Sequence, residues 1–327
     1  MKSIRWGIIG CGDVTEVKSG PALQKIEDSE LVAVMRRDAA KAEDYARRHD
    51  VPRWYADADQ LIADPEVDAV YIATPPDSHA DYTVRVARAG KPVYVEKPMA
   101  RSYTECEQMI EACETADVPL FVAYYRRRLS GFLKVEELVK SGAIGEIRFV
   151  AASLLQPAHE SSSDPLPWRV LPDIAGAGYF FDLGSHLLDY LDYLLGPIAD
   201  VHGQAANQAG LYPAEDAVCA HFTFESGILG SGIWCFTVGE GQSRDRVEIH
   251  GNKGSIAFST FDFDPIRLET TSGVEEFPSS RPEHVQQPLL QTVVDDLLGR
   301  GTCPSTGRTA ARTSRVMDEV VSSYADR

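Results

Sequence analysis

The sequence predicts an α/β protein in which a doubly wound parallel sheet is followed by a second α/β domain with a mostly antiparallel open sheet. Up to about Ala123, short apolar runs alternate with helical segments at the spacing of a doubly wound fold. A Gly-Cys-Gly turn directly follows the first apolar run. Beyond Ala123 the alternation stops, and short strands joined by turn residues indicate an antiparallel sheet. We therefore expect two domains, residues 1–123 and 124–327.

The composition is that of a soluble globular protein and argues against two classes of partner. The 327 residues, 44% hydrophobic and 25% charged, suffice for two medium cores. A formal net charge of −17 disfavours binding to nucleic acid or to an anionic membrane. The six cysteines lack metal-ligand spacing, and no apolar run suits a signal peptide or a bilayer span. We expect a cytoplasmic protein with reduced cysteines and no bound metal.

The first residues have the order of a dinucleotide-binding Rossmann unit, namely a strand, a glycine turn and a helix. The apolar run from Ile4 to Ile9 precedes the turn, and a helical segment then extends to about Ile26. In such units, backbone N–H groups at the turn receive the pyrophosphate. Thr15 stands where a third glycine would be, a position that serves packing more than phosphate contact. The candidate pyrophosphate-binding residues are Gly10, Gly12, Asp13 and Val14.

Two arginines follow the second apolar run, where the fold places the residue that reads the adenosine ribose. Arg36 and Arg37 come directly after Leu31 to Met35, with Lys41 as a possible third cation. An acidic side chain there would accept the 2′-OH of NAD, whereas arginine accommodates the 2′-phosphate of NADP. The arginines favour NADP, while the nearby Asp38 keeps NAD as an alternative. A solvated start of the next helix is the other interpretation of the arginines.

Two polar segments follow later strands of the predicted sheet. Thr74-Pro75-Pro76, with His79 shortly after, follows one apolar run, and Glu96-Lys97-Pro98 follows another. Chemistry in an open parallel sheet gathers at the carboxyl ends of its strands, so both segments should lie beside the glycine turn. Taken alone, Glu-Lys-Pro is more typical of a solvated lysine in a turn. The candidate cofactor contacts here are Thr74, Pro75, His79 and Glu96.

The remaining elements follow from periodicity and turn residues. In the first domain, helices are expected over 39–49, 58–63, 82–89 and 103–116, and strands over 69–73, 93–95 and 120–123. In the second, helices are expected over 132–141, 179–195, 285–298 and 309–324, and strands over 146–154, 218–224, 228–238, 246–250 and 255–261. We expect the Ser-rich segment Glu160 to Asp164 to be a mobile loop near the site.

The helix expected from Tyr179 to Leu195 carries a polar row beside its leucine stripe. Asp182, His186 and Asp189 fall at i, i+4 and i+7, and therefore on one face. In isolation, such a row is more typical of a solvated helix edge than of a site. Its interpretation depends on the other motifs in the chain.

Taken in order, these motifs resemble the Gfo/Idh/MocA oxidoreductases, which include glucose-fructose oxidoreductase, inositol dehydrogenase and 1,5-anhydrofructose reductase. The matching segments cover about two thirds of the chain and are Gly10-Cys11-Gly12, Ala73-Thr74-Pro75-Pro76 with His79, Glu96-Lys97-Pro98, Tyr125-Arg126-Arg127, and Gly176-x-Gly178 leading to Asp182-x-Gly184-x-His186-x-x-Asp189. The resemblance implies a Rossmann domain and a second domain whose large sheet often forms the oligomer interface, hence a homodimer or homotetramer. It also raises a cis Lys97–Pro98 bond as an expectation.

The resemblance further implies that Asp182 and His186 lie across the nicotinamide from Lys97. Hydride transfer to or from a sugar or polyol carbon requires a proton to move at its oxygen. His186, with an unperturbed pKa of about 6.5, is the first candidate for general acid/base. Lys97 would stabilise the substrate oxygen, or donate a proton if burial lowers its pKa, and Asp182 would orient the substrate or His186. The candidate substrate contacts, for which packing is an equally good explanation, are Tyr125, Arg126, Trp168 and Arg169.

Three functions fit these residues. The first is an NADP-dependent sugar or polyol oxidoreductase. The second is a glycosidase of the same family that uses NAD for transient oxidation and elimination, against which Arg36 and Arg37 count. The third is a non-catalytic NADP-binding sensor, because a fold alone does not establish catalysis. The joint presence of Lys97, Asp182 and His186 counts against the sensor.

Overall fold

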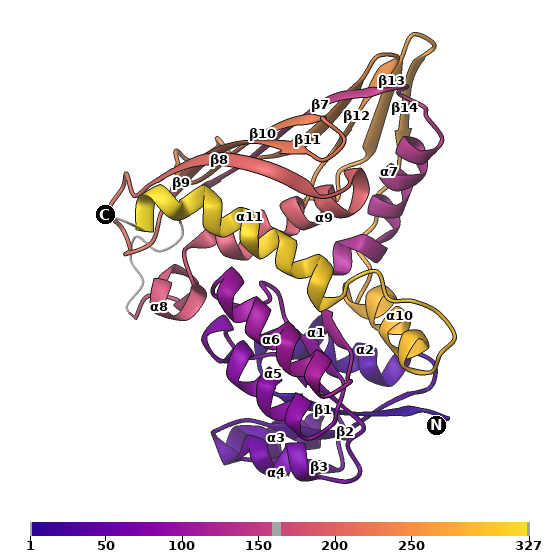
Figure 1. The fold of residues 1–327 in the computed structure, drawn as a ribbon, viewed down its shortest axis with the longest axis vertical. Coiled ribbons are helices and arrows are strands. Elements are labelled where there is room, and N and C mark those ends of the chain that lie inside the picture. Colours follow the sequence, from indigo (N-terminus) through magenta and orange to yellow (C-terminus); the bar gives the residue numbers. More distant parts are fainter. Residues whose placement is uncertain (1, 159–164, 326–327) are drawn as a thin grey trace. The chain divides into compact units, whose positions relative to one another are not determined.

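The computed structural model describes residues 2–158 and 165–325, which form two compact units (Figure 1). Unit 1 comprises Met1–Arg127 and Pro282–Ala311, and unit 2 comprises Arg128–Arg281 and Arg312–Arg327. Unit 1 is thus completed by a late segment of the chain, which the expected contiguous domains did not include. The functional boundary near Ala123 stays a prediction. The loop expected at Glu160 to Asp164 lies outside the described residues.

Unit 1 contains a parallel six-stranded sheet in the order β3-β2-β1-β4-β5-β6. The chain starts at a central strand, works outward to one edge and then returns to build the other half, which is the doubly wound order. The crevice where the order reverses, between β1 and β4, is the usual ligand site of such sheets. The strands are β1 (Ile4–Ile9), β2 (Ser29–Met35), β3 (Arg53–Tyr55), β4 (Ala69–Ile72), β5 (Val93–Val95) and β6 (Leu120–Val122).

The helices of unit 1 begin at capping residues that the sequence shows plainly. The side chains of Asp38, Asp57 and Ser102 accept backbone N–H groups in the first turns of three of them. The helical segment expected up to about Ile26 consists of two short helices, the second of which has Pro21 in its first turn. The helices are α1 (Asp13–Val17), α2 (Gly20–Lys25), α3 (Ala39–Arg48), α4 (Ala58–Ala63), α5 (His79–Arg88), α6 (Tyr103–Thr115) and α10 (Gln287–Leu297), together with the start of α11 (Gly307–Ala325).

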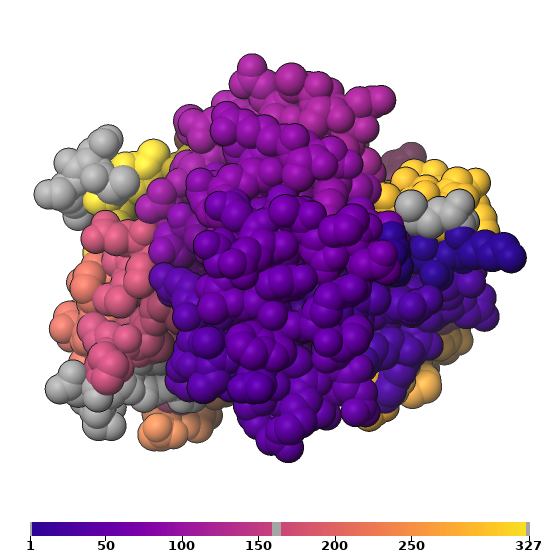
Figure 2. All heavy atoms as spheres, turned by 90° about the horizontal axis from the view of Figure 1, so that it is seen from below, coloured from indigo at the N-terminus to yellow at the C-terminus, as the bar shows by residue number. Residues whose placement is uncertain are grey.

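The core of unit 1 is the sheet itself. Every residue of β4, β5 and β6 is buried, as expected for parallel strands covered on both faces. Three large rings fill its centre, with Tyr94 5.0 Å from Tyr71 and 6.4 Å from Trp6 between ring centroids. On the face that Figure 2 presents, the indigo and purple residues of unit 1 form a closed, convex surface.

Unit 2 contains an eight-stranded sheet in the order β14-β13-β12-β11-β7-β10-β9-β8. Its neighbouring strands pair antiparallel except β7 and β10, which confirms the expected mostly antiparallel sheet. The strands are β7 (Ile147–Pro157), β8 (Ile198–Ala206), β9 (Ala217–Phe224), β10 (Leu229–Val238), β11 (Arg244–Gly251), β12 (Gly254–Phe258), β13 (Ile266–Thr270) and β14 (Gly273–Phe277).

The two faces of the large sheet differ, because helices of unit 2 cover one of them. In Figure 1, α9 and α11 run along one face of the sheet. Strand β10 alternates accordingly, with Trp234 and Phe236 buried and Leu229 and Ile233 exposed. The helices are α7 (Ser130–Lys140), α8 (Pro172–Ala175), α9 (Ser185–Leu195) and the main part of α11. None of the helices in the described part of the chain is long and apolar enough to cross a membrane.

The sequence did not predict β3, β8, β13 or β14. Strand β8 is interrupted by Gly203, which packs directly against Val320, so its alternation is weak. Strand β14 is exposed along nearly its whole length and therefore has no apolar face to detect. Both lie at edges of the sheet, where burial leaves the weakest pattern.

Two inward-facing glycines on β10 make room for aromatic rings. A Cβ atom on Gly230 would collide with the Phe222 ring of β9, and one on Gly232 with the Trp234 indole. We expect Gly230→Ala to destabilise the protein by about 1–3 kcal/mol, because overpacking forces ring or strand to move. Chemical denaturation would measure the free energy of unfolding of the variant and the wild type. The control is Gly239→Ala, where the nearest atom lies 4.0 Å away, and an equal loss in both variants would contradict the packing explanation.

Candidate functional site

The glycine turn after β1 is held tightly against the end of β4. Gly10 has a φ of +91°, and a Cβ there would lie 2.6 Å from Thr74 Cγ2, so only glycine suits the position. The N–H of Gly10 donates to the carbonyl of Met35 at 2.9 Å. A Cβ on Gly12, by contrast, would have no atom closer than 3.9 Å. A ligand can therefore approach the backbone at Gly12 while Gly10 fixes the turn.

Thr15 closes this turn with its side chain. Its hydroxyl accepts the N–H of Gly12 at 2.9 Å and donates to the Gly12 carbonyl at 2.8 Å. Tyr45 donates its hydroxyl to the Thr15 carbonyl at 2.8 Å, and Gly20 packs against both. The departure from a third glycine is thus compensated by a hydrogen-bonded threonine and a later glycine. Thr15 bonds the N–H of the N-cap residue from the N3 position, but a glycine N-cap gives no Ser/Thr-x-x-Glu/Gln signal in the sequence that could have revealed this.

Arg36 lies beside the glycine turn, as expected for a ribose-reading residue. Its Nη1 donates to the carbonyl of Cys11 at 3.2 Å and lies 3.9 Å from the Cβ position of Gly12. Asp38 instead caps α3, accepting the N–H of Lys41 at 3.2 Å. The Lys41 ammonium lies 3.6 Å from the same carboxylate, and Arg37 is exposed. The acidic alternative at this position is therefore engaged in the helix cap.

These residues fit a dinucleotide. The open backbone at Gly12 can receive a phosphate, and the Arg36 guanidinium supplies positive charge next to it. Helix α1 has only five residues, so peptide N–H groups rather than a long helix dipole would make the contact. Asp13 and Val14 would contribute through their backbone, because an exposed Asp13 carboxylate repels phosphate.

His79 joins the segments that follow β4 and β5. Its Nε2 lies 2.8 Å from the Thr74 carbonyl, and its Nδ1 lies 3.2 Å from the carbonyls of Pro98 and Met99. Burial lowers the pKa of this fully buried ring, although the carbonyl contacts oppose the shift. We infer that any effect of His79 on a cofactor is exerted through Thr74 and the Lys97 segment, which it fastens together.

Glu96 is the centre of a buried hydrogen-bond network. Its carboxylate accepts the Tyr71 hydroxyl at 2.5 Å, the Gln286 side-chain amide, and the N–H of Lys97 at 3.1 Å. Burial, followed by the Glu96 charge, raises the pKa of Tyr71 well above its ordinary value. Tyr94 donates to the other end of Gln286 at 2.9 Å. The sequence indicated Glu96 but not Tyr71 or Gln286, because neither belongs to a motif.

Lys97 follows this network directly and is half-buried. The Lys97–Pro98 bond is cis, as the resemblance led us to expect. Tyr125, from the segment after β6, has Arg126 over its ring at 5.1 Å. Burial alone would raise the pKa of Tyr125, but the cations Arg126, Lys97 and Lys18 outweigh burial and lower it. Lys97, Tyr125 and Arg126 therefore share one electropositive part of unit 1.

In unit 2, three of the predicted residues come together. Arg169 donates through Nε to Asp182 Oδ2 at 2.9 Å, and its guanidinium lies 4.4 Å from the centre of the Trp168 ring. The Asp182 carboxylate is thereby held in one direction, whereas Arg169 remains 42% exposed and available to a ligand. The sequence had treated these residues as separate candidates.

The helix expected at Tyr179 to Leu195 has two parts. A π-helical turn, Phe180–Gly184, carries Asp182, and α9 carries His186 and Asp189. The π turn changes the angular step, so the i, i+4, i+7 geometry of a regular α-helix does not hold across it. His186 is buried with its ring against Phe261, and Asp189 is buried 3.4 Å from the Thr313 hydroxyl.

Glu215 is a buried carboxylate that the sequence did not indicate. Both of its oxygens lie 2.9 Å from the N–H of Gly178, just before the π turn. Burial raises its pKa to about 7, although backbone N–H groups of Gly178 and Phe180 oppose the shift. The neighbouring Asp216 is also buried and accepts the amides of Gln208 and Ala209. A Glu-Asp pair in an otherwise ordinary turn gives no periodic or motif signal.

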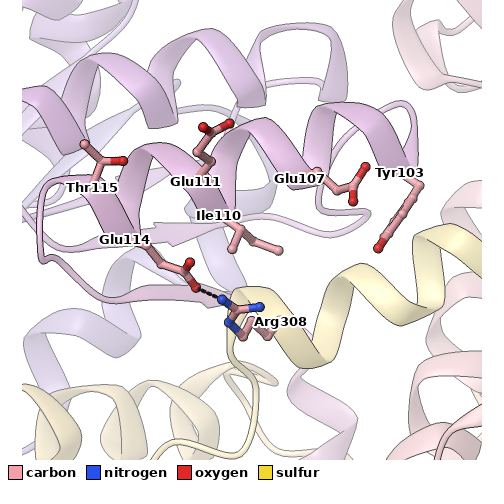
Figure 3. A pocket seen from close by; sticks show the side chains of 7 residues that line it. All are labelled: Tyr103, Glu107, Ile110, Glu111, Glu114, Thr115 and Arg308. Carbon is pink, nitrogen blue, oxygen red and sulfur yellow. Dashed lines mark ion pairs between the residues drawn. The ribbon is translucent and has the colours of Figure 1, made fainter.

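A shallow pocket of about 370 Å³ lies along α6 (Figure 3). Glu107, Glu111 and Glu114 line it, and Arg308 at the start of α11 pairs with Glu114. Such carboxylates repel a nucleotide phosphate. None of the candidate site residues lines this pocket, so the site remains at the strand ends described above.

Comparison with known proteins gives two family matches in the order of the chain. Residues 4–124 match an oxidoreductase family with an NAD-binding Rossmann fold. Residues 132–257 match the GFO/IDH/MocA C-terminal domain. The first match spans β1 to the end of β6, and the second spans α7 and most of the large sheet.

Individual proteins agree with the family matches over nearly the whole chain. Oxidoreductase P35 of Formosa agariphila is 38% identical over 96% of this chain and 97% of its own. The 1,5-anhydro-D-fructose reductase of Ensifer adhaerens is 26% identical, covering 93% and 91%. The structure of levoglucosan dehydrogenase with NADH and levoglucosan has the same fold, with a TM-score of 0.87 over 99% and 98% of the chains at 23% identity. The chain therefore belongs to the Gfo/Idh/MocA family of oxidoreductases, with an NAD-binding Rossmann fold.

Proposed function

We propose that this protein is an NADP-dependent oxidoreductase that moves a hydride between nicotinamide and a sugar or polyol carbon. The observation that carries the proposal is the setting of Lys97. It follows β5 at the carboxyl end of the parallel sheet, between the buried Glu96 network and the His79 contacts. A lysine whose backbone is held so firmly at this edge of the sheet is better suited to meet a substrate oxygen than a lysine in a solvated turn.

The proposed preference for NADP rests on Arg36 and Asp38. The Arg36 guanidinium lies at the glycine turn, where a 2′-phosphate would gain a charge-assisted hydrogen bond. The Asp38 carboxylate caps α3, so it is less able to accept a ribose 2′-OH. NAD remains the alternative, since levoglucosan dehydrogenase, which shares the fold, was solved with NADH.

The residues have separate tasks in this proposal. Bound nicotinamide would supply or accept the hydride. Lys97 would hold the substrate oxygen through its ammonium, and His186 would move the proton at that oxygen. Asp182, fixed by Arg169, would orient a substrate hydroxyl or His186. Tyr125, Arg126 and Trp168 would complete the substrate contacts.

A sugar or polyol substrate is supported by the names of the relatives. The Ensifer enzyme is a reductase of 1,5-anhydro-D-fructose, and the solved dehydrogenase contains levoglucosan. Trp168 is partly exposed and, with Arg169 over its ring and Asp182 beside Arg169, would offer the apolar surface and hydrogen-bonding groups that a sugar needs.

We further propose that the protein forms a homodimer or homotetramer through the outward face of the large sheet. Phe149 on β7 and Leu229 on β10 are paired neighbours, exposed by 44% and 58%, and Ile233 is 50% exposed. The Phe149 ring stacks on His250 of β11 at 4.5 Å. An apolar patch across two adjacent strands, with His250 of a third strand beside it, is more typical of an interface than of a free surface. A cytoplasmic location stays a prediction from the cysteine pattern.

We expect Lys97→Ala and His186→Ala each to lower turnover by about 10²–10⁴-fold, because each removes a group that acts on the substrate oxygen. Binding of NADPH, measured by fluorescence titration, should change little. The substrate comes from a panel of polyols, aldoses and ketoses tested with NADP and NAD, read at the nicotinamide absorbance.

Lys140→Ala is the matched control, because that lysine pairs with Glu136 at the surface of unit 2. Full activity in both the Lys97 and the His186 variant would refute the assigned roles. Hydrolysis of a glycoside without net change in nicotinamide absorbance would select the glycosidase instead.

Arg36→Ala should weaken NADPH binding by about 10- to 100-fold and NADH binding by clearly less, because both cofactors lose a cation near the pyrophosphate but only NADPH also loses a charge-assisted hydrogen bond to its 2′-phosphate. Isothermal titration calorimetry with both cofactors measures the difference. Arg47→Ala, whose guanidinium pairs with Asp44 at the surface, serves as control. An equal loss for both cofactors would argue against NADP selectivity at this position.

Ile233→Lys should shift the protein toward monomers, because a charge within the apolar patch opposes association. Size-exclusion chromatography with light scattering measures the mass. Trp54→Lys is the control, since Trp54 is 40% exposed but lies on β3 of unit 1. An unchanged assembly in the Ile233 variant, or a monomeric wild type, would rule out this face as the interface.

A further inference from the structure

We propose that Glu215 is a positioning residue whose buried carboxylate holds the Gly178 backbone and thereby sets the direction of the turn that carries Asp182. The proposal rests on the proposed function, in which Asp182 and His186 act on the substrate. Glu215 does not touch either side chain in the contacts described. It acts through the peptide groups that precede them.

Both residues are needed for the contact between Glu215 and Gly178, the first for its carboxylate and the second for its lack of a side chain. The carboxylate oxygens each lie 2.9 Å from the N–H of Gly178, and Glu215 is only 1% exposed. A Cβ on Gly178 would lie 2.8 Å from the Glu215 carbonyl and 2.9 Å from the Ala214 Cβ. Two chain segments 37 residues apart therefore meet at Gly178, and the Glu215 carboxylate accepts the N–H of that glycine.

Gly178 passes this constraint to the site. Its carbonyl accepts the N–H of Phe181 at 3.1 Å and that of Asp182 at 3.5 Å, so the residue bound by Glu215 also starts the π turn. The turn leads directly into α9 and His186. Asp182 is in addition fixed by Arg169. A change at Gly178 would therefore move Asp182 against its ion pair and shift the beginning of α9.

The groups around Glu215 and its burial determine the pKa of its carboxyl group. Asp216 is the charged side chain that acts on it and raises its pKa, while peptide groups of Gly178, Phe180 and Glu215 itself lower it. On the adjoining segment, Tyr179 packs against Tyr212 and Phe236, which carry no charge. Burial is the largest influence and brings the pKa of Glu215 to about 7.

Ionisation of Glu215 has opposite consequences for stability and for alignment. Because the pKa in the folded protein is raised above the ordinary carboxyl value, the neutral acid is favoured, and stability is lost as the pH rises through 7. The carboxylate, however, is the stronger acceptor for the Gly178 amide. Glu215→Gln, which is neutral at every pH and nearly isosteric, separates the two consequences.

The test compares kcat of the wild type and Glu215→Gln from pH 5.5 to 8.5. We expect kcat values within about twofold at pH 5.5 and about tenfold lower in the variant at pH 8.5, because a small misalignment costs roughly this much in rate. Over the same range, the melting temperature of the variant should rise relative to wild type. A merely structural glutamate would lower stability and activity together. Cofactor affinity should stay unchanged.

Asp216→Asn is the matched control, because Asp216 is equally buried and adjacent but holds the amides of Gln208 and Ala209. At pH 8.5 its kcat should match that of the wild type, because Glu215 is ionised in both. At lower pH its kcat should not fall below that of the wild type, because loss of the Asp216 charge lowers the pKa of Glu215. If Glu215→Gln follows the wild-type kcat profile at every pH, the proposal is overturned. We use Glu215→Gln rather than Glu215→Ala because the alanine variant could fail to fold, whereas glutamine is nearly isosteric.

A readout without turnover keeps this proposal separate from the proposed function. The imidazole signal of His186, assigned by its loss in His186→Gln, can be followed by NMR in selectively labelled protein. We expect Glu215→Gln to shift that signal above pH 7 and Asp216→Asn to leave it in place. An unmoved His186 signal in Glu215→Gln overturns the positioning role, whether or not Lys97 and His186 prove catalytic.

Discussion

The structure depends on hydrogen bonds that satisfy buried carboxylates. A charged group removed from water is costly unless donors replace its hydration. Glu96 meets this need with Tyr71, Gln286 and the N–H of Lys97. Each donor comes from a different part of unit 1, so the charge can be accommodated only when all of them are in place. The direction of Lys97 is therefore a result of the folding of the whole unit.

In unit 2, buried carboxyl groups around α9 are likewise supplied with hydrogen-bond donors. Asp192 is buried and receives the guanidinium of Arg312 from α11, while Asp189 lies against Thr313 one residue further on. Glu215 receives the Gly178 amide at the other end of the segment. Both ends of the stretch that carries Asp182 and His186 are thus anchored by carboxylates. In both units, hydrogen bonds to buried carboxyl groups hold the segments that carry the candidate residues, which is what preorganisation of a site requires.

Much of the fold and some of the site could be predicted from the sequence. Parallel strands with continuous apolar runs, and helices with Asp or Ser caps, gave a clear signal, as β4 and α3 illustrate. Glycine and proline at strand ends located Gly10 and Lys97-Pro98, whereas the cis form of that bond was expected only from the family resemblance. Edge strands such as β14 could not be predicted, because exposure leaves no alternation.

The hidden part of the site consists of supporting residues. Tyr71 is one apolar-looking residue in a buried strand, and its hydrogen bond to Glu96 depends on tertiary contact. The π turn at Phe180–Gly184 could not be predicted from the leucine stripe, because only Leu183 of the stripe lies in the turn and the other leucines lie in the regular helix α9. Local patterns therefore predicted the side chains that we propose meet ligands, but not the residues that hold those side chains in place.

The return of the chain to unit 1 has a consequence for how this protein could have evolved. Gln286 is fully buried, donates to Glu96 and accepts from Tyr94, yet it lies 190 residues beyond the carboxylate. A fragment ending after β6 would retain the nucleotide turn but leave that carboxylate short of a donor. The segment up to the end of β6 is consequently not a self-sufficient unit that could be moved alone into another protein. Recombination that exchanged it for another would have to exchange the late segment as well, so the two stretches should be inherited together.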